Sequence, residues 1–530
     1  MANDRRESYT RDGIEEMKWG LVRATIDRDV WDSVRGEGAM RCFAGSPDEG
    51  YRISFDHDAI LHDREQEPGY EPPTWMTHHR LPPVPQKRNE ITDRTAYVED
   101  YQGNRTSETF DVWADPPNSG TFEVQGLYRK WANRVDEVFT GWDQVDHMPY
   151  EKNFWQAAGR LRDAIKPLET MSVPGEPYYA ACRSLGLVEH DPGAQGTTPP
   201  ERMWAPQING PIDRFVIPLQ GTFLNLFVLG ELLAAQLDGM GKMWQNARLS
   251  VMEIGWYATK KMSRDAGRID VQAIIKSAGW VVGAMGLIAM PTPASIGLAA
   301  TGIILASADA ILEEIKNGGK DVLDLEVAIQ GGSAEEILRS TESALNSDRT
   351  SGLEPQIEID EADSIDMLGV ARSHLDNDQA VYDVAAKTYK TCFTMEVSDV
   401  QEDTAPNTKQ DVDISVEFER LRDAGKTFAD ELGQELQGVS RGVQDTFSTS
   451  SAWERPELPG GVAIGIGLTG PWENWSPVRD HLVRILDTTA TQVVEVGEYL
   501  ISAANYLERQ DASAKEAMEK ASQELDKVFK

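Results

Sequence analysis

Apolar residues recur at three- and four-residue intervals through several long stretches of the chain, which is the spacing of amphipathic helices. The first such stretch lies within residues 121–187. A polar turn ending at Pro149 interrupts it, and the stretch resumes and ends near Pro167. We therefore predict a helical hairpin, with Trp142 and Trp155 on either side of its bend and its helices packed on each other or on later helices. Its apolar positions are Val124, Leu127, Tyr128, Trp131, Val135, Val138, Phe139 and Trp142, then Phe154, Ala158, Leu161 and Ile165.

The same spacing predicts helices over residues 213–276, 363–391, 416–447 and 477–529. The last of these begins next to Ser476 and Pro477, and proline is well tolerated in the first turn of a helix. An amphipathic helix gains most of its stability from packing its apolar face, so none of these helices is stable alone. We therefore predict a mainly α protein, an elongated multi-helix bundle.

Residues 277–308 contain no charged side chain. Pro291 and Pro293 divide the stretch into halves of about 14 and 15 residues, each too short to cross about 30 Å of hydrocarbon as a straight helix. We interpret it as a buried Gly/Ala-rich hydrophobic helical hairpin. The alternative is a membrane-active hairpin that inserts into a bilayer or lies on it, with Trp280, Pro291 and Pro293 as its landmarks.

The remaining segments are turn-rich or acidic. Residues 1–120 are rich in Pro, Asp, Arg and Gly and predict an irregular N-terminal arm or small domain, with short strands near residues 51–55 and 121–124. The rest of the chain divides into a hairpin (121–187), a linker (188–212), long helices with the hydrophobic hairpin (213–316), an acidic mixed region (317–450), a turn-rich connector (451–476) and a C-terminal helix (477–530). Within the acidic region, residues 352–368 are interpreted as a flexible connector.

The net charge of the chain limits the kinds of partner that it is expected to bind. The 530 residues include 87 acidic and 52 basic side chains, and the net charge of −35 disfavours binding to nucleic acid or anionic lipid. Three widely separated cysteines, Cys42, Cys182 and Cys392, match neither a disulfide framework nor a metal site and are expected to be buried thiols. The N-terminus lacks the apolar core and cleavage site of a secretory signal peptide.

Catalytic motifs are not found in the sequence. It contains no Gly-x-Ser-x-Gly elbow, phosphate-binding Gly-x-x-x-x-Gly-Lys loop, His-Glu-x-x-His pair or Cys-x-x-Cys pair. The histidines and aspartates at 56–58 and 62–63, with His78 and His79, have no metal-site spacing and are interpreted as solvated surface residues rather than metal ligands. Most tryptophans stand at helical spacing, which indicates core positions. We predict no catalysis, no small-molecule substrate, no metal and no cofactor.

Four parts of the chain follow one another in a recognisable order. A Trp-containing helical hairpin precedes the long helix LGELLAAQLDGMGKMWQNARLSVMEI and the Gly/Ala-rich stretch, and a C-terminal helix reads LDTTATQVVEVGEYLISAANYLERQDASAKEAMEKA. This order resembles that of large actinobacterial proteins associated with type VII (ESX-type) secretion, relatives of the Trp-x-Gly hairpin superfamily. No Trp here begins a Trp-x-Gly turn, and no Tyr is followed four residues later by an acidic residue. Tyr506 comes nearest, with Asp511 five residues on.

The resemblance implies a secreted or cell-surface helical protein that is exported without a signal peptide, and a weak partner or secretion-signal surface at Tyr506 and Asp511. From the residues alone, Tyr506 is interpreted as a half-buried core tyrosine. A helical protein partner or self-association is expected from the apolar helix faces. The alternatives are a cytoplasmic interaction protein, a membrane-active or toxin-like effector that uses residues 277–308, and a virion or other assembly subunit.

Overall fold

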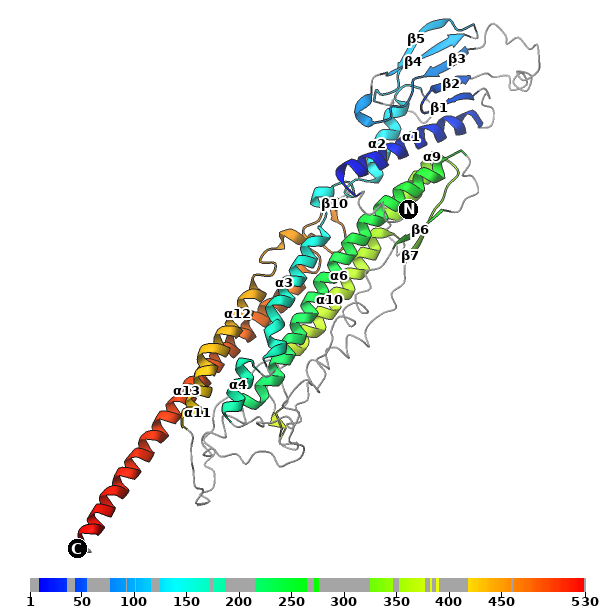
Figure 1. Ribbon diagram of the computed structural model, residues 1–530. Helices are drawn as coiled ribbons and strands as arrows, with labels where there is room; N and C mark the ends of the chain where they lie inside the picture. Colours follow the sequence, from blue (N-terminus) through cyan, green and yellow to red (C-terminus); the bar gives the residue numbers. More distant parts are fainter. Residues whose placement is uncertain are drawn as a thin grey trace.

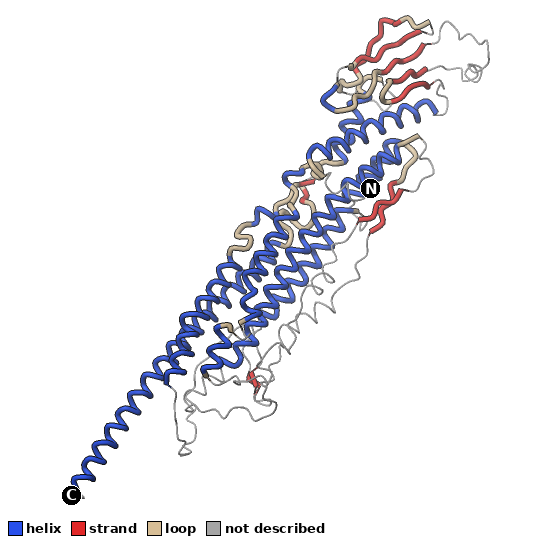
Figure 2. The backbone as a smooth tube through the Cα atoms, viewed as in Figure 1, coloured by secondary structure: helices blue, strands red, loops and turns tan. Residues whose placement is uncertain are grey.

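The computed structural model describes residues 9–35, 43–54, 77–91, 93–100, 102–115, 124–171, 175–185, 215–264, 271–275, 325–346, 352–376, 382–383, 388–389, 418–458 and 461–528. They form an elongated, mainly helical body, with a small β-sheet at one end and a single helix extending from the other (Figure 1). The tube in Figure 2 follows the same axis from sheet to projecting helix. The predicted elongated helical architecture is therefore confirmed in outline. The linker 188–212 and the uncharged stretch 277–308, with Trp280, Pro291 and Pro293, lie outside the described residues.

The central helix of the body is α6 (Ile217–Met262), against which α1, α3, α9, α10 and α13 all pack. Its first half carries apolar side chains on every side, and nearly all of them are buried. It is the one described helix long and apolar enough to cross a membrane, but 89% of its most apolar window is covered by the rest of the protein. Such a helix is equally typical of a protein core.

The predicted apolar stripes form the core of the two helices after residue 121. All eight positions from Val124 to Trp142 are buried, as are the four from Phe154 to Ile165. The two helices do not pack on each other as a hairpin, however. Helix α2 (Leu127–Val138) packs on α1 and α9, whereas α3 (Glu151–Thr170) packs on α6 and α12. The two follow one another along the body (Figure 1), because α1 and later helices supply the apolar partners that a hairpin would have supplied.

Of the two alternatives predicted for residues 1–120, the structure agrees with a small domain that contains short strands and not with an irregular arm. Residues 11–35 form helix α1 (Arg11–Arg35), which buries Ile14, Trp19, Val22, Ile26 and Val30. It lies under an antiparallel five-stranded sheet in the order β1 (Phe43–Ser46), β2 (Gly50–Ser54), β3 (Thr77–Leu81), β4 (Thr95–Asp100) and β5 (Arg105–Asp111). Charged residues stand beside most apolar positions of α1, so the helical spacing of its apolar residues is not evident in the sequence. Strand β2 matches the strand expected near residues 51–55.

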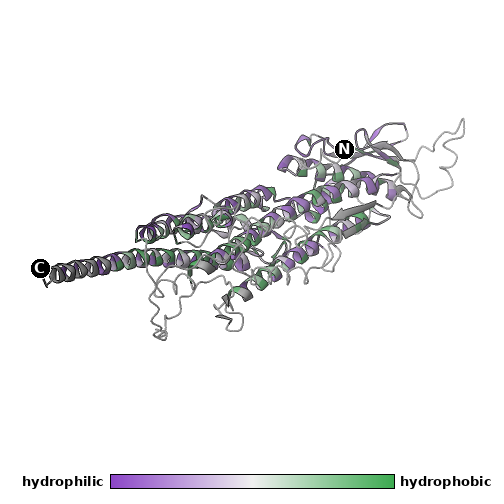
Figure 3. Cartoon of the chain, turned by 60° about the horizontal axis from the view of Figure 1, so that its bottom comes forward, coloured by the Kyte–Doolittle hydropathy of each residue, from purple (hydrophilic) through white to green (hydrophobic). Residues whose placement is uncertain are grey.

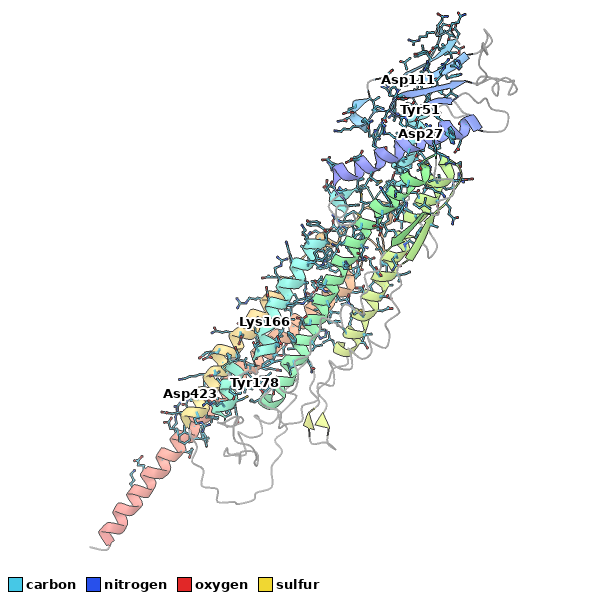
Figure 4. All side chains as sticks on the ribbon, turned by 45° about the vertical axis from the view of Figure 1, so that its right-hand side comes forward. Asp27, Tyr51, Asp111, Lys166, Tyr178 and Asp423 are labelled. Carbon is cyan, nitrogen blue, oxygen red and sulfur yellow. The ribbon has the colours of Figure 1, made fainter. Side chains whose placement is uncertain are left out.

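Polar contacts join this sheet to the helical body. The Tyr51 hydroxyl on β2 donates a hydrogen bond to Asp27 of α1 at 3.1 Å, and Arg264, just after α6, donates to the same carboxylate at 2.8 Å. Figure 4 shows Asp27 and Tyr51 close together at this junction. Trp19 of α1 also stacks on Trp113, with ring centroids 5.9 Å apart. The N-terminal unit is therefore an integrated cap on the body.

Two predicted helices have different bounds. The helix predicted over 213–276 ends at Met262, and residues 271–275 form strand β6 (Val271–Ile275), paired with β7 (Leu325–Ile329). The segment interpreted as a flexible connector belongs to α10 (Leu353–Asp376), so the helix predicted at 363–391 begins and ends earlier. The short strands β8 (Tyr382–Asp383) and β9 (Thr388–Tyr389) fall where that helix was expected to continue.

The remaining helices complete the body. They are α4 (Pro177–Ser184), α9 (Ala334–Asn346), α11 (Phe418–Lys426), a π-helical stretch (Thr427–Leu432), α12 (Gly433–Gln444) and α13 (Trp472–Val528). Helices α11 and α12 lie along α13, as the helical patterns over 416–447 and 477–529 allow. In Figure 3 the helices of the body carry both hydrophilic and hydrophobic residues, in keeping with amphipathic packing.

Candidate interaction site on the C-terminal helix

Helix α13 begins in an aromatic cluster that fixes its first turn. The Trp472 and Trp475 rings are stacked with centroids 5.9 Å apart, and Trp475 also contacts Trp453. The Trp475 indole N–H donates to the Leu233 carbonyl of α6 at 3.2 Å. Phe154 of α3 meets Trp453 edge to face at 4.9 Å. Because these rings come from distant parts of the sequence, the start of α13 is anchored to the core of the body.

Glycines bring the middle of α13 into close contact with its neighbours. A Cβ added to Gly425 of α11 would lie 2.6 Å from the Gly497 carbonyl oxygen, and one added to Gly497 would lie 2.5 Å from the Gly425 carbonyl oxygen. Backbone therefore meets backbone where α11 and α13 pack. Val493, Leu500 and Ala504 are buried on the face that α13 turns toward the body. Packing by this face holds α13 against the bundle up to about residue 508.

Arg422 of α11 makes the last contacts between the bundle and α13 among the described residues. Its guanidinium donates to Asn505 at 3.1 Å and to Glu508 at 2.8 Å. Beyond them, residues 509–528 continue α13 for about 30 Å, at 1.5 Å per residue. No other element in the described part of the chain accompanies this projecting segment (Figure 1), which leaves the body near Asp423, labelled in Figure 4.

Two tyrosines are exposed near the point where α13 leaves the body. Tyr506 is 62% exposed and Tyr499 is 46% exposed. They are seven residues apart, so they lie on the same side of the helix two turns from each other. The interpretation of Tyr506 as a half-buried core residue is therefore wrong: the bundle-facing positions around it are Ala504 and Leu507. Asp511 lies in the projecting segment, one turn further on, and only its backbone is described.

A fully buried ion pair ties the segment before α13 to α10. Arg455 and Glu361 are both 0% exposed, with Arg455 Nη1 2.5 Å from Glu361 Oε1. The same nitrogen donates to the Ile464 carbonyl at 2.9 Å, and Glu361 Oε2 accepts the Ile466 backbone N–H at 2.6 Å. The Arg455 guanidinium also lies over the Trp244 ring of α6 at 5.2 Å. We call this arrangement the Arg455–Glu361 clamp.

The turns around the clamp depend on glycine. Gly465 and Gly470 have φ angles of +78° and +51°, and side chains at these positions would collide with Arg455 and Glu361. The nearby hairpin of β10 (Glu457–Leu458) and β11 (Val462–Ala463) lies in the segment predicted as a turn-rich connector. The clamp and this hairpin therefore position the start of α13 relative to α10.

A second carboxyl of α10 borders the clamp. Burial, followed by the nearby charge of Glu358, raises the pKa of Glu354 to about 7, although the Gly465 backbone N–H favours the ionised form. Burial also raises the pKa of Glu361, against the opposing effect of Arg455. The Glu354 carboxyl therefore takes up a proton near neutral pH. The clamp region therefore couples the stability of the body to pH.

The other residues singled out by the sequence lie in the body. Trp142 is fully buried, and its indole N–H donates to Asn346 of α9 at 2.5 Å. Trp155 is half-buried on α3, where a side chain at Gly241 of α6 would collide with its indole. Both tryptophans serve packing. The structure does not bring them together with Tyr506.

Of the candidate metal ligands and thiols, His78 and Cys182 are also buried in the body. His78, expected on a solvated surface, is only 4% exposed on β3. No group of three or more His, Cys, Asp or Glu side chains able to hold a metal ion is found among the residues that the structure describes. Cys182 is buried as expected, and burial raises its pKa to about 12, which keeps the thiol protonated and unreactive.

Sequence reasoning missed Glu361 and Arg455. A usable signal was present: Ile357, Glu361, Ser364, Leu368, Ala371 and Leu375 recur at helical spacing, so a charged residue stands at a core position of α10. A charge at such a position predicts a buried partner of opposite sign. The partner, Arg455, is 94 residues away, and no local pattern identifies it.

Comparisons with known proteins do not assign this chain to a family. No protein-family model, curated protein or solved structure matches this chain. The candidate site therefore rests on the geometry of α13 and on the sequence.

Proposed function

We propose that this protein is a non-catalytic helical interaction protein associated with type VII secretion, and that the end of α13 is the part its partner contacts. The observation that carries the proposal is the position of Tyr506. It is 62% exposed, and it lies between Asn505 and Glu508, the two residues through which Arg422 holds α13 where the helix leaves the bundle. A helix end of this kind presents exposed aromatic side chains, Tyr506 and Tyr499, on an anchored support.

The anchoring of α13 supports this role. The aromatic cluster at its start, the close contact of Gly425 with Gly497, and the Arg455–Glu361 clamp all fix the helix relative to the body. A binding element gains affinity when its support is ordered before binding, because less conformational entropy is lost. The rigid part of α13 thus orients the projecting segment.

The link to type VII secretion rests on the sequence resemblance. In that family an aromatic residue followed by an acidic one at a helix end marks proteins for export. Here Tyr506 and Asp511 have the residue types at a spacing of five instead of four, which turns the acidic position by about 100° around the helix. We therefore propose recognition through a helical protein partner, with the protein exported to the surface or medium.

Site-specific photo-crosslinking tests the partner surface. A photo-reactive amino acid replaces Tyr506 in the full chain, and a control replaces Val462, which is 57% exposed on the β10–β11 hairpin. We expect crosslinks to a discrete helical protein from position 506 and none from position 462. Equal crosslinking from both positions, or none from 506, would refute the α13 site.

Fractionation of the native host tests the secretion association. The protein is followed in cells, envelope and medium, with and without a working type VII secretion ATPase. We expect it in the envelope or medium only when the ATPase works. Retention in the cytoplasm in both strains would refute export and leave a cytoplasmic interaction protein.

A further inference from the structure

The bundle-facing stripe of α13 continues in the sequence beyond the last bundle contact. Leu500 and Ala504 are buried, and Leu507 packs against the core. Alternating steps of four and three residues from Leu507 lead to further positions inside α13, namely Asp511, Ala514, Met518, Ala521, Leu525 and Val528. This 4–3 alternation over several heptads is the pattern of a two-stranded coiled coil. The packing seam of the bundle therefore extends along the projecting segment.

A partner would stabilise such a seam. Residues 509–528 continue a helix that already begins in the body, but in proteins most helical stability comes from packing. Within the segment, Glu516 and Lys520 form an ion pair at 2.9 Å, one turn apart. Exposed pairs of this kind contribute only about 0.3–0.5 kcal/mol. A second helix on the seam would supply the missing stabilisation.

The charge of the segment favours a second copy of this chain. The whole protein carries −35, yet residues 509–530 contain five basic and five acidic side chains. Two bodies repel each other, whereas two of these segments do not. The segment spans about 30 Å, several times the Debye length of about 8 Å at physiological salt. An antiparallel pair places the bodies at opposite ends, where salt screens their repulsion.

The residues at the seam positions favour the same orientation. An antiparallel pair in which position 518 faces position 521 of the second copy also matches 514 with 525 and 511 with 528. Two of these layers then combine an alanine with a larger residue, Met518 or Leu525, so small and large alternate. A parallel pair would match alanine with alanine and Asp511 with Asp511, leaving gaps and a like-charge contact in the seam.

We infer that the projecting segment of α13 pairs with the same segment of a second copy, as an antiparallel two-helix coiled coil. This inference rests on the proposed function, since it names the partner of the same helix. Exposed Tyr499 and Tyr506 then lie next to the point where the paired segment leaves each body. The dimer is end to end, with one acidic body at each end.

Sedimentation of the full chain tests the pairing. We expect a reversible dimer at micromolar concentration. Met518→Asp introduces a charge into the seam and is expected to raise the dimer dissociation constant at least about tenfold. The matched control, Ser513→Asp, adds the same charge at an exposed position off the seam and is expected to preserve the dimer. An unchanged thermal melt of the body shows that both variants remain folded.

Cysteine crosslinking tests the orientation. Ala514→Cys on one tagged copy and Leu525→Cys on another are expected to crosslink after mixing, whereas Ala514→Cys alone gives no crosslink above that of the parent chain with its three native cysteines. A crosslink between two Ala514→Cys copies, a monomer at all concentrations, or a dimer insensitive to Met518→Asp would overturn the inference. A monomer that still crosslinks another protein from position 506 would overturn the self-pairing while the proposed function stands.

Discussion

Removal of the positive charge from the Arg455–Glu361 clamp is expected to destabilise the body strongly. In Arg455→Met, the Glu361 carboxyl stays fully buried and loses its cation, although the Ile466 N–H remains as a donor at 2.6 Å. Breaking a buried ion pair by removing one partner costs about 3–5 kcal/mol. We expect a loss of this size in the free energy of unfolding at neutral pH.

The magnitude is expected to depend on pH. Burial already raises the pKa of Glu361, and Arg455 is the group that opposes this shift. Without Arg455, the carboxyl is expected to take up a proton more readily, which removes the buried charge. The destabilisation by Arg455→Met should therefore shrink as the pH falls toward the ordinary pKa of glutamate.

A double-mutant cycle isolates the ion pair from general damage. Glu361→Gln with Arg455→Met removes both charges and keeps an amide oxygen for the Ile466 N–H. The double variant is expected to be more stable than Arg455→Met, within about 1–2 kcal/mol of the parent, with a coupling energy of at least about 2 kcal/mol. Urea unfolding measures the global effect, and hydrogen exchange in residues 461–470 measures local opening.

Two results would refute this reasoning. An Arg455→Met variant as stable as the parent would mean that the charge pair contributes nothing. A double variant whose loss equals the sum of the two single losses would mean that packing, not charge compensation, sets the stability of this site.

Three further predictions concern other parts of the body. Glu354→Gln should raise the free energy of unfolding by about 2 kcal/mol at pH 8. The folded-state pKa of about 7 lies above the unfolded value of 4.5, so the carboxyl stabilises the fold below pH 4.5 and this stabilisation is lost as the pH rises through 7. Thermal melts from pH 4.5 to 8 test this, and a variant with the parent's pH slope would contradict it. Lys18→Met should lower the free energy of unfolding by about 2–4 kcal/mol, because the 4% exposed ammonium lies 2.8 Å from Asp136 and 2.7 Å from Asp143. The control Arg11→Met removes an exposed pair with Asp146 and should lower it by under about 1 kcal/mol in the same urea assay. Gly425→Ala should cost about 1–3 kcal/mol by forcing α11 from α13, whereas Gly438→Ala on α12, with open space around it, should be neutral or stabilising; equal melting temperatures for the two would exclude the close backbone contact.

Helical spacing predicted which side chains form the core but not which helices meet. The stripe from Val124 to Trp142 is buried throughout, yet its helix packs on α1 and α9 rather than on α3. An apolar stripe specifies a buried face, while the choice of partner depends on shape and on contacts far apart in sequence. The same limit applies to Trp142, whose indole partner, Asn346, is 204 residues away.

Local composition also gave a wrong prediction in segments where charged residues are frequent. The α10 segment carries Glu354, Glu358, Asp360 and Glu361 within two turns, and α1 has charges beside most of its apolar positions. Acidic composition is typical of disordered connectors, which explains the connector assigned to residues 352–368. In the fold, however, Glu354, Asp360 and Glu361 are buried. Glu361 is matched by Arg455 and by the Ile466 N–H, and Glu354 by the Gly465 N–H. Tertiary partners, not composition, decide whether such a segment is ordered.

The contrast between the clamp and the end of α13 supports the proposal that one acidic chain combines a rigid body with a binding element. Charges inside the body are neutralised in place, as Arg455 with Glu361 and Lys18 with two aspartates show. The end of α13 instead balances its charges along its own length and has its last bundle contacts at Asn505 and Glu508. Because α13 begins next to the clamp and ends about 30 Å beyond the bundle, disturbance of the clamp should change how the projecting segment is presented. A clamp variant that stays folded but loses dimerisation would link the two sites through this single helix.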